Sequence, residues 1–312
     1  MTPDDPASVI EASFSSAGLH SFSCIGREGL LELAERSEPS AVERYGLLES
    51  SGAVVAALPY DPRGSSAEPP ALCVGAFAAF NRYAALTRLL LGAGRSIAGA
   101  FGLPPKGFRA IVNSRLPEKT LAALAGIGFV GRSSLLVSYS YGPACLLGAL
   151  LLPPGFPDVS TAYRSVPAIG AKGGCGTCRA CADACPTGAI DRDGAGVDLE
   201  RCIQHWTTRP GVVPEPVRSV WGRRLYGCDA CVAACPHSAR ATASPGEVTS
   251  PAERSDALLL PAERRPGRFV PGPFIESASD EEIRAYFRKT ALGLSWIRPE
   301  ELRRNAILAG RL

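Results

Sequence analysis

A dense run of cysteines is the feature of this sequence that points to chemistry. Eight of the 11 cysteines lie between Cys175 and Cys235. Residues 175–186 read Cys-Gly-Thr-Cys-Arg-Ala-Cys-Ala-Asp-Ala-Cys-Pro, which has the spacing C-x2-C-x2-C-x3-C-P. This spacing is typical of 4Fe–4S cluster binding in bacterial ferredoxins. The sequence therefore predicts iron–sulfur chemistry in this part of the chain.

A second, shorter cysteine motif completes the set. Residues 228–236 repeat the last three cysteine positions of the first motif and its proline, and Cys202 stands apart upstream. In two-cluster ferredoxins the cysteine before the proline ligates the other cluster. The predicted first cluster is therefore bound by Cys175, Cys178, Cys181 and Cys235, and the predicted second cluster by Cys185, Cys202, Cys228 and Cys231.

A zinc site is the alternative interpretation of these cysteines. Zinc is typically bound by two separated C-x2-C pairs, whereas the triple spacing followed by Cys-Pro favours two 4Fe–4S clusters. The three remaining cysteines, Cys24, Cys73 and Cys145, stand alone in apolar surroundings. We interpret them as small core residues.

Composition limits the class of protein. The chain has 312 residues, of which 46% are hydrophobic and 20% charged, so a globular protein of roughly two domains is expected. The net charge of +3 is too small to indicate nucleic-acid binding by itself. No apolar run is long enough for a membrane helix, and the acidic N-terminus does not resemble a signal peptide. A cytoplasmic protein with reduced thiols and no membrane partner is predicted.

The segment before the cysteines alternates strand-like and helix-like runs. Strands are predicted at 52–59, 72–79, 108–112, 135–138 and 145–152, and helices at 82–101 and from Pro117 to about Gly126. This alternation predicts an α/β (α+β) fold with a mixed sheet, forming a cofactor and substrate domain over residues 1–158. Because no dinucleotide or P-loop motif occurs, a flavin or nicotinamide domain is not supported.

The rest of the chain divides into two further parts. Residues 159–242 form the predicted two-cluster, ferredoxin-like domain. Residues 243–312 follow as a connector and C-terminal helices: 243–276 are rich in proline and arginine and are expected to be mostly irregular, and 279–310 are expected to be helical. The length of chain before the clusters indicates that they supply electrons to a reaction centre in the first domain.

Four stretches, taken in order, resemble one known family. They are FRAIVNS at 108–114, AGIGFVGRSSLL at 125–136, the eight cysteines with their flanks, and LRRNA at 302–306. In these the chain is similar to the epoxyqueuosine reductases, which are cobalamin-dependent iron–sulfur enzymes. The resemblance runs from about residue 50 to the C-terminus.

The resemblance implies a reaction and a set of partners. Two 4Fe–4S clusters would pass electrons singly to a cobalamin, and the epoxide of epoxyqueuosine in tRNA would be reduced to queuosine. An electron donor such as flavodoxin or ferredoxin is implied, and tRNA is implied as substrate. Seven arginines of the C-terminal third would contact phosphates, the alternative being a solvated surface: Arg264, Arg265, Arg268, Arg284, Arg288, Arg303 and Arg304. Cofactor binding is expected at Tyr83, Arg132, Ser133 and Ser134.

The sequence departs from the family at the expected proton donor. Asn113 stands where the family has an aspartate, and an amide can donate a hydrogen bond but cannot release a proton near neutral pH. Asn113 is the predicted catalytic residue. Arg132 stands where the family has lysine, and Tyr83 is retained within an altered segment. Two alternatives stay open: a related corrinoid reductase acting on another substrate, such as a small molecule, and a non-enzymatic electron-transfer protein.

Overall fold

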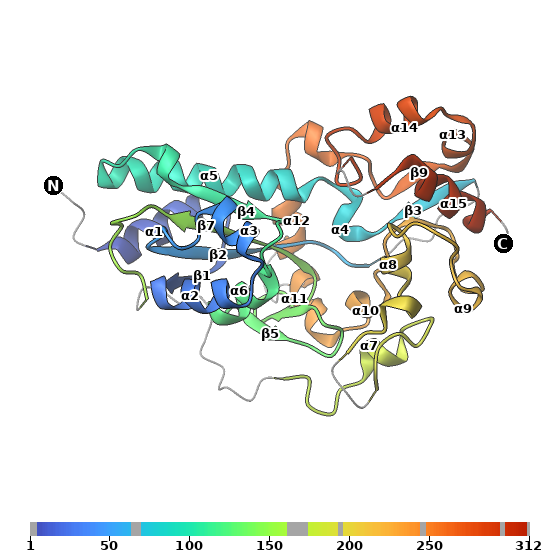
Figure 1. The fold of residues 1–312 in the computed structure, drawn as a ribbon, viewed down its shortest axis with the longest axis horizontal. Helices are drawn as coiled ribbons and strands as arrows, with labels where there is room; N and C mark the ends of the chain where they lie inside the picture. Colours follow the sequence, from blue (N-terminus) through green and yellow to red (C-terminus); the bar gives the residue numbers. More distant parts are fainter. Residues whose placement is uncertain are drawn as a thin grey trace. The chain divides into compact units, whose positions relative to one another are not determined.

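The computed structural model describes residues 5–63, 70–160, 174–192, 196–243, 248–293 and 297–310. The chain forms two compact units (Figure 1). Unit 1 comprises Met1–Pro59, Tyr83–Val130 and Leu135–Gly174, and unit 2 comprises Tyr60–Arg82, Gly131–Ser134 and Cys175–Leu312. The functional division at residues 158 and 242 stays a prediction.

A four-stranded sheet forms the centre of unit 1. Its order is β1 (Ser21–Gly26), β2 (Gly52–Pro59), β7 (Cys145–Leu152) and β4 (Arg109–Val112), and all neighbours are antiparallel. Every residue of β2 is buried, as its uninterrupted apolar sequence requires. The predicted strands at 52–59 and 145–152 are confirmed with these bounds.

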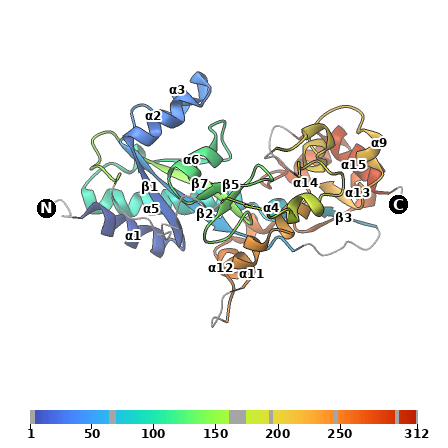
Figure 2. The ribbon, with the colours of Figure 1, turned by 90° about the horizontal axis from the view of Figure 1, so that it is seen from below.

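Helices cover both faces of this sheet (Figure 2). On one face lie α1 (Pro6–Ser16) and α5 (Arg82–Phe101), and on the other α2 (Arg27–Glu35) and α6 (Glu118–Leu124). Gly148 of β7 lets α5 approach closely, because a Cβ there would lie 2.9 Å from the Leu86 side chain. The predicted helix at 82–101 is confirmed. Unit 1 also contains α3 (Pro39–Tyr45), the 3-10 helix η1 (Pro105–Gly107), and the strands β5 (Gly128–Val130) and β6 (Leu136–Ser138), which pair antiparallel.

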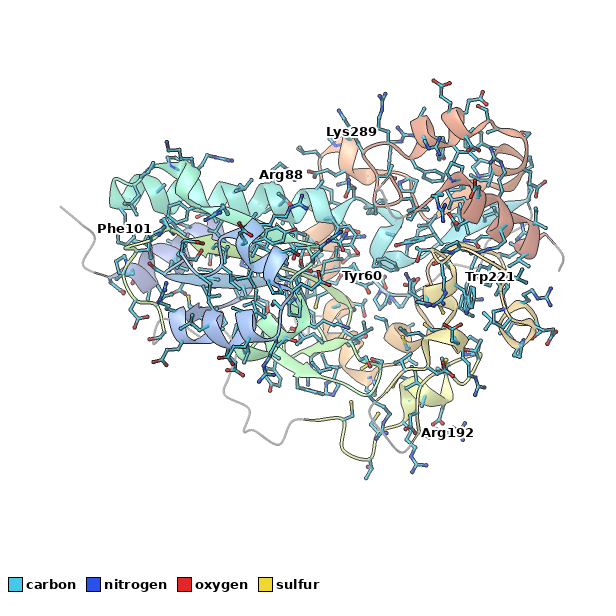
Figure 3. The ribbon with its side chains drawn as sticks, in the orientation of Figure 1. Tyr60, Arg88, Phe101, Arg192, Trp221 and Lys289 are labelled. Atoms are coloured by element: carbon cyan, nitrogen blue, oxygen red, sulfur yellow. The ribbon has the colours of Figure 1, made fainter. Side chains whose placement is uncertain are left out.

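Unit 2 is built on a small mixed sheet. Strand β3 (Ala71–Val74) pairs in parallel with β8 (Arg224–Tyr226) and antiparallel with β9 (Phe269–Pro271). Trp221, which is fully buried, donates its indole N–H to the Arg224 carbonyl at 2.8 Å (Figure 3). A mixed sheet was expected within residues 1–158, but the sheet of unit 1 is antiparallel throughout and the mixed pairing lies in unit 2. The α/β (α+β) fold class is confirmed.

Short helices make up most of the remainder of unit 2. The α-helices are α4 (Ala76–Ala79), α7 (Ala180–Asp183), α8 (Ile203–Trp206), α9 (Glu215–Arg218), α10 (Ala230–Ala233), α11 (Ala239–Thr242), α12 (Pro251–Ala257), α13 (Gly272–Ser277), α14 (Asp280–Phe287) and α15 (Pro299–Ala309). The 3-10 helices are η2 (Leu199–Arg201), η3 (Pro236–Ser238) and η4 (Pro261–Arg264). The helical prediction for 279–310 is confirmed by α14 and α15 within the described residues.

Two predictions of local structure are wrong. The strand expected at 72–79 ends at Val74 and is followed by α4. The N–H of Ala76, the first residue of α4, donates to the side chain of Asp229. The segment 243–276 is not mostly irregular, because it holds α12 and β9. Ser250 and Glu253 form a capping box at α12, a helix start that the proline- and arginine-rich composition obscured.

Two further observations concern single features of the molecule. No helix among the described residues has the length and apolar character required to cross a membrane. Of the isolated cysteines, Cys24 is buried, whereas Cys73 and Cys145 are half-buried. Burial raises the pKa of the Cys24 and Cys145 thiols to about 12, so both are held as neutral groups.

Candidate iron–sulfur site

The two cysteine motifs adopt the same local structure in unit 2. Cys178 and Cys228 each precede a four-residue helix, α7 and α10 respectively, and these two helices contact each other. Cys185 and Cys235 follow the two helices, and each precedes its proline. Each helix contains the second cysteine of its Cys-x2-Cys pair, Cys181 or Cys231, and turns the chain before the final cysteine, as the predicted exchange of ligands requires.

Four thiols of the predicted first cluster influence one another electrostatically. Burial raises the pKa of Cys181, and the neighbouring Cys175 and Cys178 thiols raise it further. Burial likewise raises the pKa of Cys235, with Cys175 and Cys181 adding to the effect. Cys178 is exposed. The structure therefore brings Cys235 from the second motif to the cysteines of the first.

The predicted second cluster has thiols with stronger burial. The pKa of Cys231 rises to about 12, first because of burial and then because of Cys228, Cys202, Cys181 and Cys185. Burial also raises the pKa of Cys228, and Cys202 contributes. Because Cys231 is influenced by thiols of both sets, the two sets lie next to each other. Each set has the same four cysteines that the sequence predicts for one cluster. That these cysteines are the cluster ligands stays a prediction.

Cys185 is prepared to carry a negative charge. Burial raises its pKa, but hydrogen bonds from Thr187, Ala189 and Ile190 outweigh burial and leave the pKa lowered. The Ala189 N–H donates to the Cys185 Sγ at 3.2 Å. A thiolate is the form that binds iron, so these donors favour metal binding.

The cysteines are not arranged around a single point. Within the described parts of the chain, no three His, Cys, Asp or Glu side chains converge as ligands of one metal ion. A 4Fe–4S cluster binds each thiolate through a separate iron, so its ligands stand farther apart than those of a single ion.

The loop between β5 and β6 contacts the first motif. The Arg132 N–H donates to the Cys175 Sγ at 3.3 Å, and the Arg132 guanidinium donates to the carbonyls of Gly176, Cys178 and Arg192. Ser134 lies in the left-handed region, with φ of 58°, and its N–H closes a turn on the Gly131 carbonyl at 2.9 Å. The cofactor-binding role expected for Arg132, Ser133 and Ser134 stays a prediction.

The LRRNA segment supports the second motif through α15. The amide of Asn305, which is fully buried, donates to the carbonyls of Thr207 and Leu225 at 2.9 and 2.8 Å. The Arg304 guanidinium donates to the carbonyls of Trp206, Arg209 and Gly211. These two side chains fix the segment after Cys202 and the strand before Cys228.

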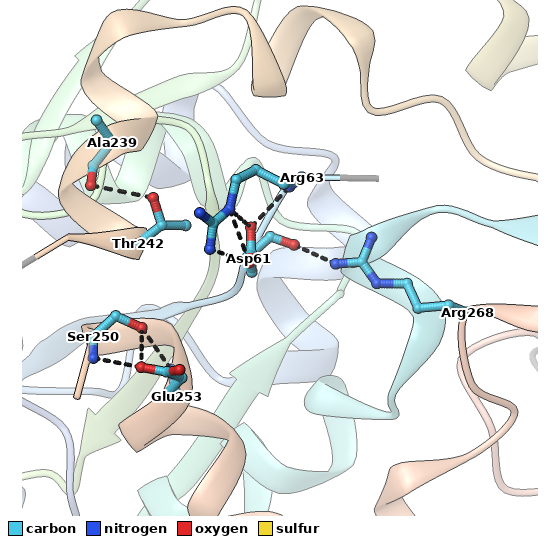
Figure 4. A network of polar contacts seen from close by, with 7 residues as sticks. All are labelled: Asp61, Arg63, Ala239, Thr242, Ser250, Glu253 and Arg268. Carbon is cyan, nitrogen blue, oxygen red and sulfur yellow. Dashed lines mark hydrogen bonds and ion pairs between the residues drawn. The ribbon is translucent and has the colours of Figure 1, made fainter. Parts of the chain in front are cut away.

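Most arginines predicted to contact phosphates donate to protein groups instead. The acceptors are the Asp256 carbonyl for Arg264, the Tyr286 carbonyl for Arg265, the Asp61 carbonyl for Arg268, and Asp280 with the Ala278 carbonyl for Arg303. Figure 4 shows Arg268 donating to the Asp61 carbonyl at 2.6 Å, while the Asp61 carboxylate accepts from Arg63. These arginines hold unit 2 together, and their contact with phosphates stays a prediction.

Asp229 is a buried acid beside the second cluster that sequence reasoning missed. Its Oδ2 accepts from the Ala76 N–H at 2.7 Å, and its Oδ1 has no hydrogen-bond partner among the described residues. Burial raises its pKa, although the Ala76 N–H and the charges of Arg268 and Arg224 oppose this. The side chain joins the Cys228–Cys231 turn to the segment that follows β3. Its place inside the cysteine motif was the only sequence signal.

Asn113 lies in unit 1, at a left-handed turn after β4. Its φ is 53° and its side chain is exposed. The next N–H, that of Ser114, donates to the Glu118 Oε1 at 2.6 Å. Burial raises the pKa of Glu118, which is half-buried, to about 7, although its hydrogen bonds with Ser114 oppose the shift. Glu118 is a second missed residue, because its position at a helix start suggested only capping.

Tyr83 is the second residue of α5 and is half-buried. Its carbonyl accepts from the Thr87 hydroxyl at 2.9 Å. The adjacent Arg82 is buried: it pairs with Asp256 at 2.5 Å and donates to the Ala76 carbonyl at 3.1 Å. Arg82 therefore anchors this altered segment within unit 2, and the cofactor role of Tyr83 stays a prediction.

Residues 174–238 match the family of 4Fe-4S double cluster binding domains. An epoxyqueuosine reductase from Streptococcus thermophilus superposes with a TM-score of 0.67 at 20% identity, over 96% of this chain and 79% of that chain. A crystal structure of epoxyqueuosine reductase with an epoxyqueuosine-modified tRNA stem loop gives 0.68 at 23% identity, over 97% and 80%. The fold is that of the epoxyqueuosine reductases.

The relatives found by sequence comparison are also named epoxyqueuosine reductase. Epoxyqueuosine reductase from Aliivibrio fischeri is 39% identical over 132 residues, which are 42% of this chain and 33% of that protein. Epoxyqueuosine reductase from Staphylococcus aureus is 30% identical over 194 residues, which are 62% of this chain and 44% of that protein. The chain thus matches less than half the length of these relatives. The resemblance inferred from four short stretches is confirmed.

Proposed function

We propose that this protein is a cobalamin-dependent iron–sulfur reductase that converts epoxyqueuosine to queuosine in tRNA. The observation that carries the proposal is the pairing of a double 4Fe–4S domain with the epoxyqueuosine reductase fold over nearly the whole chain. Reduction of the epoxide to an alkene and water consumes two electrons and two protons. The clusters supply the electrons singly, from a donor such as flavodoxin or ferredoxin.

Unpaired polar atoms in unit 2 fit a corrinoid. Gln204 Oε1 and Asp229 Oδ1 are buried next to second-cluster cysteines and have no partner among the described residues. The edge of a corrinoid carries amide groups that donate hydrogen bonds, which such acceptors require. Gln204, Asp229, Arg132, Ser133 and Ser134 are the residues of unit 2 that would hold the group. The cofactor role of Tyr83, a residue of unit 1, is a separate proposal. When bound, cobalamin supplies low-valent cobalt able to open an epoxide.

The residues around Asn113 divide the work that an aspartate does in the family. The exposed Asn113 amide donates a hydrogen bond to the substrate oxygen and holds it. Glu118, whose Oε1 accepts from the Ser114 N–H at 2.6 Å, has a pKa raised by burial to about 7, so its carboxyl holds a proton near neutral pH next to the Asn113 turn. Asn113 is thereby proposed to orient the substrate, and Glu118 to be the proton reserve.

An activity assay tests the proposed function. Protein reconstituted with iron, sulfide and cobalamin is incubated with epoxyqueuosine-containing tRNA and a low-potential reductant, and queuosine is measured after nucleoside digestion. Turnover that requires cobalamin is expected. The absence of turnover, under conditions in which the Staphylococcus aureus relative is active, would overturn the tRNA substrate.

Asn113 favours one second candidate, a corrinoid reductase acting on a small molecule. A substrate with a less demanding leaving group needs no carboxylic acid at this position. Cobalamin binding without turnover of tRNA, unchanged in Asn113→Asp, would support this candidate. Recovery of epoxide reduction in Asn113→Asp would instead support altered chemistry on tRNA. Two clusters without corrinoid binding would indicate an electron-transfer protein.

A further inference from the structure

We propose that Arg132 is a positioning residue that sets the reduction potential of the first cluster and holds its ligand loop in place. The inference rests on the cluster-binding role of unit 2 and is independent of the substrate. It assigns to the loop Gly131–Ser134, which connects β5 and β6, a function in electron transfer.

The main chain of Arg132 reaches the first cluster directly. Its N–H donates to the Cys175 Sγ at 3.3 Å. The turn that presents this N–H is fixed by the Ser134 N–H, which donates to the Gly131 carbonyl at 2.9 Å. A hydrogen bond to a ligating sulfur stabilises the more negative, reduced cluster, and so raises its reduction potential.

The side chain of Arg132 closes the loop that carries the ligands. Nε donates to the Cys178 carbonyl at 3.3 Å, Nη2 to the Gly176 carbonyl at 3.5 Å, and Nη1 to the Arg192 carbonyl at 2.9 Å. Three acceptors at different positions suit the rigid fork of a guanidinium, whereas a lysine ammonium has a single centre. The contacts place a permanent positive charge beside an exposed cluster loop.

Burial alone does not hold this loop. Cys178 is exposed, whereas Cys181 and the second-cluster thiols Cys228 and Cys231 are half-buried. The exposed Cys178 end of the first set is therefore held by the directed hydrogen bonds of Arg132 rather than by packing. Removal of Arg132 is expected to affect the first cluster selectively.

The test is a redox titration of three reconstituted variants, followed by electron paramagnetic resonance. Arg132→Gln removes the charge and most of the fork, and Arg132→Lys keeps the charge. Arg192→Gln is the matched control, because its guanidinium is exposed and pairs only loosely with Asp183 at 3.4 Å (Figure 3), and its carbonyl remains to accept from Arg132.

In Arg132→Gln, one of the two one-electron steps is expected to move to lower potential. The fraction reduced at a fixed potential should fall about tenfold, which corresponds to about 59 mV for a one-electron couple. Arg132→Lys should shift less, and Arg192→Gln should leave both steps unchanged. Loss of about half of the iron in Arg132→Gln alone would equally support the holding role.

Two results would overturn the inference. One is a retained pair of clusters in Arg132→Gln with both potentials unchanged, and the other is an equal shift in Arg192→Gln. None of these readouts uses tRNA or cobalamin. A failure of the proposed function therefore leaves this test interpretable, and a failure of this test leaves the proposed function standing.

Discussion

The two cysteine motifs have nearly the same spacing but are stabilised differently. The first motif is open to solvent at Cys178 and is held by hydrogen bonds from Arg132. The second is half-buried from Cys228 to Cys231 and is backed by Asn305 of α15. In each case the supporting residue is distant in sequence from the motif that it supports. Similar ligand spacing therefore does not imply similar clusters, because segments outside the motif create the surroundings.

The largest expected effect comes from removing one ligand on each side. Cys231→Ser should lose the second cluster, so that iron falls from about eight to about four atoms per chain. It should also destabilise unit 2, because Cys231 is half-buried and lies among thiols of both sets. Cys178→Ser changes an exposed ligand and should weaken only the first cluster. Iron analysis and thermal unfolding are the measurements. If both variants lose the same amount of thermal stability, the two motifs do not differ in how they are stabilised.

Breaking the support of the second motif should have the next largest effect. Asn305→Leu leaves the buried carbonyls of Thr207 and Leu225 without their donor. The expected cost is about 2–4 kcal/mol in the free energy of unfolding, measured by denaturant titration. Ile307→Ala on the same helix is the control, since Ile307 is 51% exposed and should cost less than about 1 kcal/mol. If Asn305→Leu loses only the first cluster, the conclusion that Asn305 supports the second motif is wrong.

What the sequence could predict follows from how local each signal is. The strands at 52–59 and 145–152 and the helix at 82–101 are encoded by continuous apolar patterns, and they were predicted correctly. Strand β9 could not be predicted, because Phe269–Pro271 becomes a strand only by pairing with the distant β3. The hydrogen bond from Arg132 to Cys175 joins residues 43 apart, and no local pattern records it. Burial of Asp229 and Glu118 depends in the same way on the folded surroundings.

A third prediction compares the access of reagents to the two clusters. Since Cys178 is exposed and Cys231 is half-buried, a chelator with a mild oxidant should release iron in two phases, the first cluster losing iron several-fold faster. Stopped-flow absorbance measures both phases. In Arg132→Gln the fast phase should accelerate while the slow phase is unchanged. A single phase in the unmodified protein would contradict a difference in protection.

The smallest expected effect tests whether the contrast between buried and exposed groups also holds for two glutamates at helix starts. Burial raises the pKa of Glu118 from 4.5 to about 7, so the folded state binds its proton more tightly than the unfolded chain does. Stability should therefore fall as pH rises from about 4.5 to 7, by at most about 3 kcal/mol. Glu118→Gln should flatten this slope, because it replaces the titrating carboxyl with an amide. The amide oxygen can still accept from the Ser114 N–H.

The matched control is Glu282→Gln at the start of α14. Glu282 is exposed, and hydrogen bonds with Ser279 lower its pKa, so its contribution is present above its unfolded pKa and is lost as pH falls. Its removal should leave the decline between pH 4.5 and 7 in place. Denaturant titrations across that range measure both variants. If Glu118→Gln keeps the original slope, Glu118 is ionised throughout, and it cannot act as the proton reserve beside Asn113.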